Sequence, residues 1–140
     1  MPNEALQYKV ILSGIVVISF GVYLLSLFVI TILKRQVAVS YFSSFASSAK
    51  AHYVEQALRL LVGTSLVSFS GSMLFSEYFR IFGWIIVVST IVLIFTPWRW
   101  HNKLGERLIP LTIRNINVYA VSASVLGAFI LYAAVCPLFC

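Results

Sequence analysis

Residues 10–33 read VILSGIVVISFGVYLLSLFVITIL and contain no charged side chain. As an α-helix, which rises about 1.5 Å per residue, this stretch would be roughly 36 Å long. The hydrocarbon core of a bilayer is about 30 Å thick, so such a helix is long enough to cross it with some tilt. We therefore expect the first transmembrane span at residues 10–33.

Three further apolar stretches follow, at about residues 55–76, 81–98 and 116–138. The second is the most polar, and the third should close at Pro97, because proline cannot continue the hydrogen bonding of a helix interior. Only a few residues join the second and third stretches, so these two should form an antiparallel hairpin. The expected fold is all-α: an integral membrane four-helix transmembrane bundle, built as a single domain over residues 1–140.

The composition agrees with a protein whose main solvent is lipid. Hydrophobic residues make up 61% of the chain and charged residues 10%, whereas soluble domains usually carry about 25% charged residues. The formal net charge is +6, but the basic residues stand at the ends of apolar stretches and form no patch with interleaved aromatic residues. Nucleic acid is therefore not an expected partner.

The positions of these basic residues predict an orientation. Eight of the ten Lys and Arg residues lie in two segments, 34–59 and 99–114, which fall on the same side of the predicted membrane. The other two, Lys9 and Arg80, fall on the opposite side. Because cytoplasmic loops carry the excess of Lys and Arg, both termini should lie on the non-cytoplasmic side. A compact chain with this asymmetry suits a bacterial inner membrane.

Two connecting segments have their own character. Residues 37–51 are rich in serine and aromatic residues and could form either a loop or a helix on the membrane surface. Residues 98–111 place apolar side chains at helical spacing with basic ones between them, a pattern typical of a short interfacial amphipathic helix between spans three and four. We expect Pro110 to limit its length. The candidate headgroup-binding residues of this segment are Trp98, Arg99, Trp100, Lys103 and Arg107.

The second and fourth predicted spans are rich in small residues. Thr64, Ser68 and Ser72 are spaced by four and share one helix face. In a bilayer such a face permits close backbone approach and interhelical hydrogen bonds, so we interpret it as a packing surface within the bundle or against a partner. The alternative is a polar path through the membrane. The residues concerned are Gly63, Thr64, Ser68, Gly71, Ser72, Ala120, Ser124 and Gly127.

Charged and imidazole side chains gather where the second span enters the membrane. Glu55 and Arg59 are four residues apart, in the order that favours an intrahelical ion pair. We interpret them as an interfacial ion pair; a proton relay or a cation site is the alternative. His52 lies three residues before Glu55, but two histidines cannot complete a metal site, so no metal is expected. For His101 we expect a contact with lipid headgroups.

Cys136 and Cys140 are the only cysteines of the chain. On the non-cytoplasmic side they could close a small disulfide loop. The simpler interpretation is that both are ordinary apolar residues at the membrane boundary.

These patterns predict a protein without catalytic activity. The acidic residues are dispersed, and no nucleophile–base set or phosphate-binding glycine loop is present, so we expect neither an enzyme nor a cofactor. The leading hypothesis is an accessory or assembly subunit that contacts other membrane proteins, or itself, within the lipid bilayer. One alternative is a small transporter or channel with a polar path along the second span. Another is a lipid-binding protein that uses residues 98–107.

Overall fold

The computed structural model describes residues 2–44 and 48–139 of the chain, and no strand occurs among them. The fold is all-α, as predicted. In chain order, the elements are α1 (Pro2–Leu33), α2 (Arg35–Ser44), α3 (Ala49–Phe69), the 3-10 turn η1 (Ser70–Ser72), α4 (Ser76–Phe95), α5 (Trp98–Arg114) and α6 (Ile116–Phe139).

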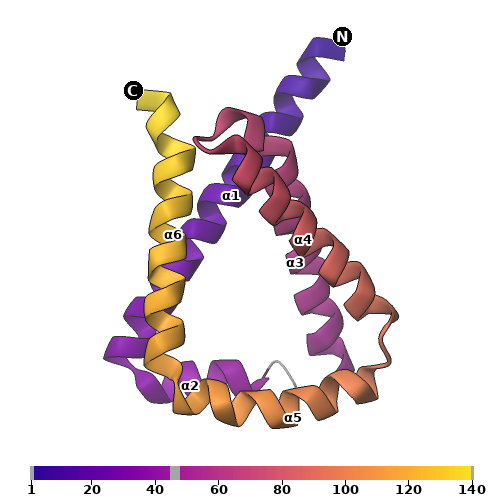
Figure 1. The fold of residues 1–140 in the computed structure, drawn as a ribbon, viewed down its shortest axis with the longest axis vertical. Helices are drawn as coiled ribbons and strands as arrows, with labels where there is room; N and C mark the ends of the chain where they lie inside the picture. Colours follow the sequence, from indigo (N-terminus) through magenta and orange to yellow (C-terminus); the bar gives the residue numbers. More distant parts are fainter. Residues whose placement is uncertain (1, 45–47, 140) are drawn as a thin grey trace.

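The long helices are arranged as two pairs (Figure 1). Helix α1 packs against α6, the helices α3 and α4 form a hairpin, and α1 joins the two pairs by packing against α3 as well. Both ends of the chain lie at one end of the molecule, and α2 and α5 lie across the other end (Figure 1). The predicted hairpin of the second and third apolar segments is therefore present.

Three of these helices, α1, α4 and α6, are long and apolar enough to cross a membrane. Helix α3 does not belong to this set. Its first half carries His52, Glu55, Gln56 and Arg59, which lower its hydrophobicity. At about 1.5 Å per residue, its 21 residues nevertheless measure roughly 31 Å.

The second and third predicted spans are displaced from their helices. The helix expected at residues 55–76 begins earlier, because Ser48 caps it by accepting a hydrogen bond from the Ala51 amide at 3.1 Å. It also ends earlier, at Phe69, and the chain then turns through η1. Phe75, with φ of 56°, is in the left-handed conformation immediately before α4. The helix expected at residues 81–98 is α4, and it ends at Phe95, before Pro97 rather than at residue 98.

The two connecting segments at the end opposite the termini are both helical. Residues 35–44 form α2, so this part of the segment is a helix and not a loop. The prediction that Pro110 limits the following helix was wrong, because α5 continues through Pro110 to Arg114. None of the residues of α5 is buried. Water or headgroups can therefore solvate the Glu106 carbonyl, which proline leaves without a donor.

Each helix pair is closed by a contact between two glycines. A Cβ atom on Gly63 of α3 would lie 3.2 Å from the carbonyl oxygen of Gly83 on α4. A Cβ atom on Gly127 of α6 would lie 2.9 Å from the carbonyl oxygen of Gly21 on α1. Of the small residues predicted to pack, Gly63 on the second span thus faces the third span, and Gly127 on the fourth span faces the first.

The apolar core lies where the two pairs approach each other. It is built from Val17, Leu24, Leu66, Phe69, Met73, Phe79, Ile130, Ala133 and Ala134. The turn between α3 and α4 is tied to this core by a backbone hydrogen bond of 3.0 Å, which the Leu74 amide donates to the Ala133 carbonyl. That carbonyl is open to an outside donor because Pro137, one helical turn further on, has no N–H.

Candidate functional site

The most unusual feature of the molecule is a group of three polar side chains at its α2–α5 end that hold buried polar atoms. His52 and Gln56 of α3 are 3% and 1% exposed, and the half-buried His101 of α5 lies against His52. The ring centroids of the two histidines are 4.3 Å apart, with an angle of 49° between the ring planes. We call His52, Gln56 and His101 the buried polar site.

Local sequence positions these side chains. The Ser48 cap fixes the start of α3, and the spacing of four residues then puts His52 and Gln56 on one face. Pro97 stands before the first residue of α5, and its carbonyl accepts a hydrogen bond from the His101 amide at 3.3 Å. His101 is consequently in the first turn of α5, where that helix departs from α4.

The polar atoms of this site have no hydrogen-bond partner among the residues that the structure describes. They are both ring nitrogens of His52, both amide atoms of Gln56, and Nδ1 of His101. Leaving a buried donor or acceptor unsatisfied costs about 1–3 kcal/mol. A helical membrane protein that keeps several such groups together therefore has a place where water or a polar ligand lowers the free energy.

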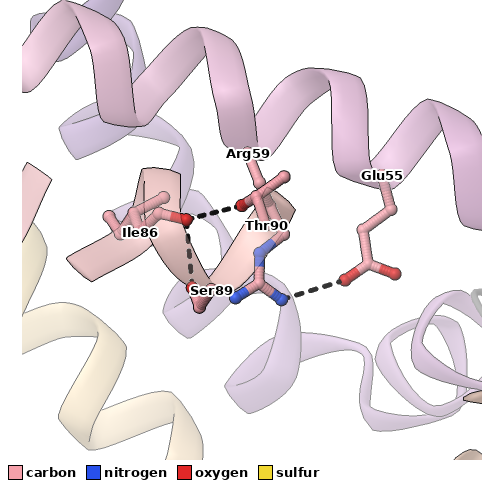
Figure 2. A network of polar contacts seen from close by, with 5 residues as sticks. All are labelled: Glu55, Arg59, Ile86, Ser89 and Thr90. Carbon is pink, nitrogen blue, oxygen red and sulfur yellow. Dashed lines mark hydrogen bonds and ion pairs between the residues drawn. The ribbon is translucent and has the colours of Figure 1, made fainter. Parts of the chain in front are cut away.

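Charged groups stand beside the site. Glu55 and Arg59, one helical turn apart on α3, form the predicted ion pair at 3.6 Å (Figure 2). Burial of the imidazole lowers the pKa of His101, and the neighbouring His52 lowers it further. Glu55 acts in the opposite direction and raises this pKa, whereas Arg59 lowers it. The fold therefore favours a neutral His101.

Other hydroxyl groups near this end bond within the protein. Thr90 of α4 is completely buried, and its Oγ1 donates to the Ile86 carbonyl at 2.6 Å. The Ser89 hydroxyl donates to the same carbonyl at 3.0 Å (Figure 2). Between α1 and α2, the hydroxyl groups of Tyr23 and Tyr41 lie 2.6 Å apart. None of these hydrogen bonds reaches His52, Gln56 or His101.

The small residues predicted as a packing face or path do not share one environment. Gly63, Ala120 and Gly127 are buried, and Ser68 and Ser124 are half-buried. In contrast, Thr64, Gly71 and Ser72 are exposed, and the Thr64 hydroxyl donates to its own helix at the Leu60 carbonyl, 2.8 Å away. The buried members serve the helix pairs, and the exposed ones lie outside them.

The candidate headgroup-binding residues lie along α5. Arg99, Trp100, Lys103 and Arg107 are exposed, and Trp98 is half-buried. They flank His101 in sequence and lie at the end of the molecule opposite the termini (Figure 1). A helix with basic and apolar residues on its exposed surface has the composition of an interfacial helix.

The remaining candidates lie elsewhere. Cys136 of α6 is half-buried, and the predicted disulfide involves Cys140, which is outside the described residues. Within 2–44 and 48–139, no three His, Cys, Asp or Glu side chains come together as a set of metal ligands.

Sequence reasoning missed Gln56 as a site residue. Its spacing of four from His52 was the available signal, because two polar residues on one face of a membrane helix rarely face lipid. This spacing could not indicate that His101 of α5 lies against His52. Comparison with protein families, curated proteins and solved structures finds no match to this chain.

Proposed function

We propose that this chain is a non-catalytic membrane protein with four spans that acts as an assembly subunit by contacting another membrane protein. In this proposal α3 is the fourth spanning helix, beside α1, α4 and α6. In the proposed orientation the end with α2 and α5 lies in the cytoplasm of a bacterial cell and both termini lie beyond the inner membrane. The eight basic residues of the segments around α2 and α5 support this orientation.

The observation that carries this proposal is the outer face of α3. Gly63 points toward α4, whereas Val54, Leu58 and Leu61 are each about half exposed, at 51%, 56% and 49%. The same face continues through three small residues, Ala57, Thr64 and Ser68. The outer face of α3 is defined by Val54, Ala57, Leu58, Leu61, Thr64 and Ser68.

Lipid is a poor explanation for this face. Acyl chains need no small side chains, whereas a second helix can approach closely over alanine and hydroxyl residues. Helix α3 is also the least apolar of the four long helices. A spanning helix of another protein would cover it and lower the cost of exposing its polar half to lipid. A second copy of this chain is the rival occupant.

Site-specific crosslinking tests the proposal. A photoreactive side chain at Leu61, on the outer face of α3, should give a discrete protein adduct in native membranes. The same group at Val125, which is 64% exposed on α6, is the control and should crosslink mainly lipid. Thr64→Leu should reduce the Leu61 adduct at least severalfold, because the leucine side chain prevents close approach. Equal adducts from both positions would contradict the proposal, and an adduct of twice the chain mass would identify self-association.

The transporter or channel alternative makes a different prediction. A path along Thr64, Ser68 and Ser72 would have to be completed by a partner, because Thr64 is exposed on the outside of the helix pair. Replacing these residues with leucine should then abolish flux of a solute while the assembly survives. In the assembly proposal the same replacements weaken the complex.

A further inference from the structure

The buried polar site offers more hydrogen-bonding capacity than the surrounding protein uses. A neutral histidine ring has one N–H donor and one nitrogen acceptor, and a glutamine amide has two donors and a carbonyl acceptor. In His52 and Gln56 all of these are buried and without partners among the described residues. A matching ligand must therefore supply both acceptors and donors.

The charge of the site restricts the ligand further. Arg59 of α3 is already paired with Glu55 at 3.6 Å, and Lys50, in the first turn of the same helix, is exposed. Burial lowers the pKa of His101. Such a site lacks the positive charge needed to hold a dianion in a desolvated place. It can hold a group with a single negative charge, because the exposed basic residues of α5 attract anions toward it.

The position of the site indicates where the ligand comes from. The site lies at the end where α5 crosses the ends of the long helices (Figure 1). The apolar spans stop at Leu33 and Phe95 near this end, so phospholipid headgroups would lie at the same level. A ligand that enters from the membrane need not cross an aqueous surface.

We infer that the buried polar site, formed by His52, Gln56 and His101, binds the headgroup of a phospholipid that carries one phosphodiester charge and free hydroxyl groups, such as a phosphatidylglycerol. The phosphodiester oxygens accept hydrogen bonds from the N–H groups of His52 and His101 and from the Gln56 amide nitrogen. The headgroup hydroxyls donate to the Gln56 carbonyl and to the second ring nitrogen of His52. The acyl chains remain in the bilayer.

This inference does not depend on the assembly proposal. Leu61, on the outer face of α3, is exposed, whereas His52 of the same helix is buried against His101 of α5. Lipid binding and crosslinking at Leu61 are therefore separate measurements. Either can fail while the other succeeds.

The experiment uses the full chain, delipidated in mild detergent. Short-chain phosphatidylglycerol is titrated, and bound lipid is counted by native mass spectrometry together with the shift of the thermal midpoint. Phosphatidylcholine of the same chain length and inorganic phosphate are the comparison ligands. We expect both to bind at least tenfold more weakly than phosphatidylglycerol, because choline offers no hydroxyl donors and free phosphate carries the higher charge.

Two variants locate the binding. Gln56→Leu removes three hydrogen-bonding groups at nearly constant volume, and His101→Gln changes the ring on α5 while keeping a polar side chain. Each should weaken phosphatidylglycerol binding at least tenfold. Gln36→Leu, at an exposed glutamine on α2, is the matched control and should bind like the unmodified chain.

The lipid-free thermal midpoint shows whether Gln56 has a structural role instead. Because its amide has no partner in the described protein, Gln56→Leu should leave this midpoint unchanged or raise it. The inference is overturned if this variant is markedly less stable without lipid, or if it binds phosphatidylglycerol as tightly as Gln36→Leu. It is also overturned if inorganic phosphate or phosphatidylcholine binds as tightly as phosphatidylglycerol, or if no lipid binds.

Discussion

The backbones of Gly63 and Gly83 touch across the α3–α4 hairpin. A Cβ atom on Gly83 would lie 2.9 Å from the carbonyl oxygen of Gly63, and 3.0 Å from the Cβ atom of Leu66. Both neighbours are backbone or close to it, so neither can move aside cheaply. The hairpin therefore depends on the absence of a side chain at both positions, as close glycine contacts between membrane helices do in general.

Gly83→Ala should consequently destabilise the hairpin. The added methyl group forces the two helices apart, which typically costs about 1–3 kcal/mol, although alanine gains roughly 0.5–1 kcal/mol as a helix former. Unfolding in mixed detergent micelles measures the net loss. Gly71→Ala is the matched control, because nothing lies within 4 Å of a Cβ atom there. Equal stability of the two variants would show that the glycine contact does not hold the hairpin.

This glycine contact also shows which part of the helix packing can be predicted from the sequence. Gly63 and Gly127 could be recognised as packing residues, because they stand among other small residues on spans two and four. Their partners Gly83 and Gly21 stand in strongly apolar runs, where a glycine gives no local sign of the helix it faces. Pairing is a tertiary property, and it joins α3 to α4 and α6 to α1.

The ends of the helices and the buried polar site were also only partly predictable from the sequence. The Ser48 cap of α3 was missed, because Ser48 is one of several serines in residues 37–51. The turn after Phe69 was also missed, because Ser70 and Ser72 continue the small-residue pattern of the helix. In the buried polar site, the histidines were noticed separately. Their 4.3 Å contact depends on α5 folding back beneath α3, for which residue spacing contains no signal.

Pro137 of α6 leads to a second prediction. The Leu74 amide donates to the Ala133 carbonyl at 3.0 Å. In a regular helix this carbonyl would accept a hydrogen bond from the amide of residue 137. Pro137→Ala supplies a competing amide within α6. A hydrogen bond of this kind contributes about 1 kcal/mol, so exchange of the Leu74 amide hydrogen should become roughly fivefold faster.

Amide hydrogen exchange followed by NMR in micelles measures this effect. Pro110→Ala is the control, since Pro110 lies within α5, where no residue is buried. It should leave the exchange of the Leu74 amide unchanged. If Pro137→Ala slowed this exchange or left it unaltered, the proline would have no part in holding the turn against α6.

The proposed orientation gives a third prediction. Alkaline phosphatase, which is active only outside the cytoplasm, should be active when fused after Cys140 and inactive when fused after Arg107 on α5. The reason is the excess of Lys and Arg in the two connecting segments. A fluorescent protein that folds only in the cytoplasm should give the reverse pattern. The opposite result at both positions would show that the orientation is the reverse of the proposed one. Phosphatase activity at both positions would contradict the four-span topology.

The contact between His52 and His101 gives a fourth prediction, a dependence of stability on pH. Burial lowers the pKa of His101 below about 6.5, the ordinary value. The groups that act on it are His52 on α3, which lowers the pKa, Glu55, which raises it, and Arg59, which lowers it. In the unfolded chain His101 gains its proton near the ordinary pKa, while in the fold it stays neutral to lower pH. The stabilisation is therefore complete above about pH 6.5, and it decreases as the pH falls below that value.

The thermal midpoint of the delipidated chain, measured from about pH 7.5 to about pH 5, should accordingly fall toward acid. Because His101→Gln cannot gain a proton, its midpoint should fall less over the same interval. The difference between the two profiles isolates this group from the other titrating side chains. It should be absent above about pH 7 and grow below about pH 6.5. If the two profiles are parallel across the whole interval, protonation of His101 does not affect the stability of the fold. The contact with His52 then does not oppose that protonation.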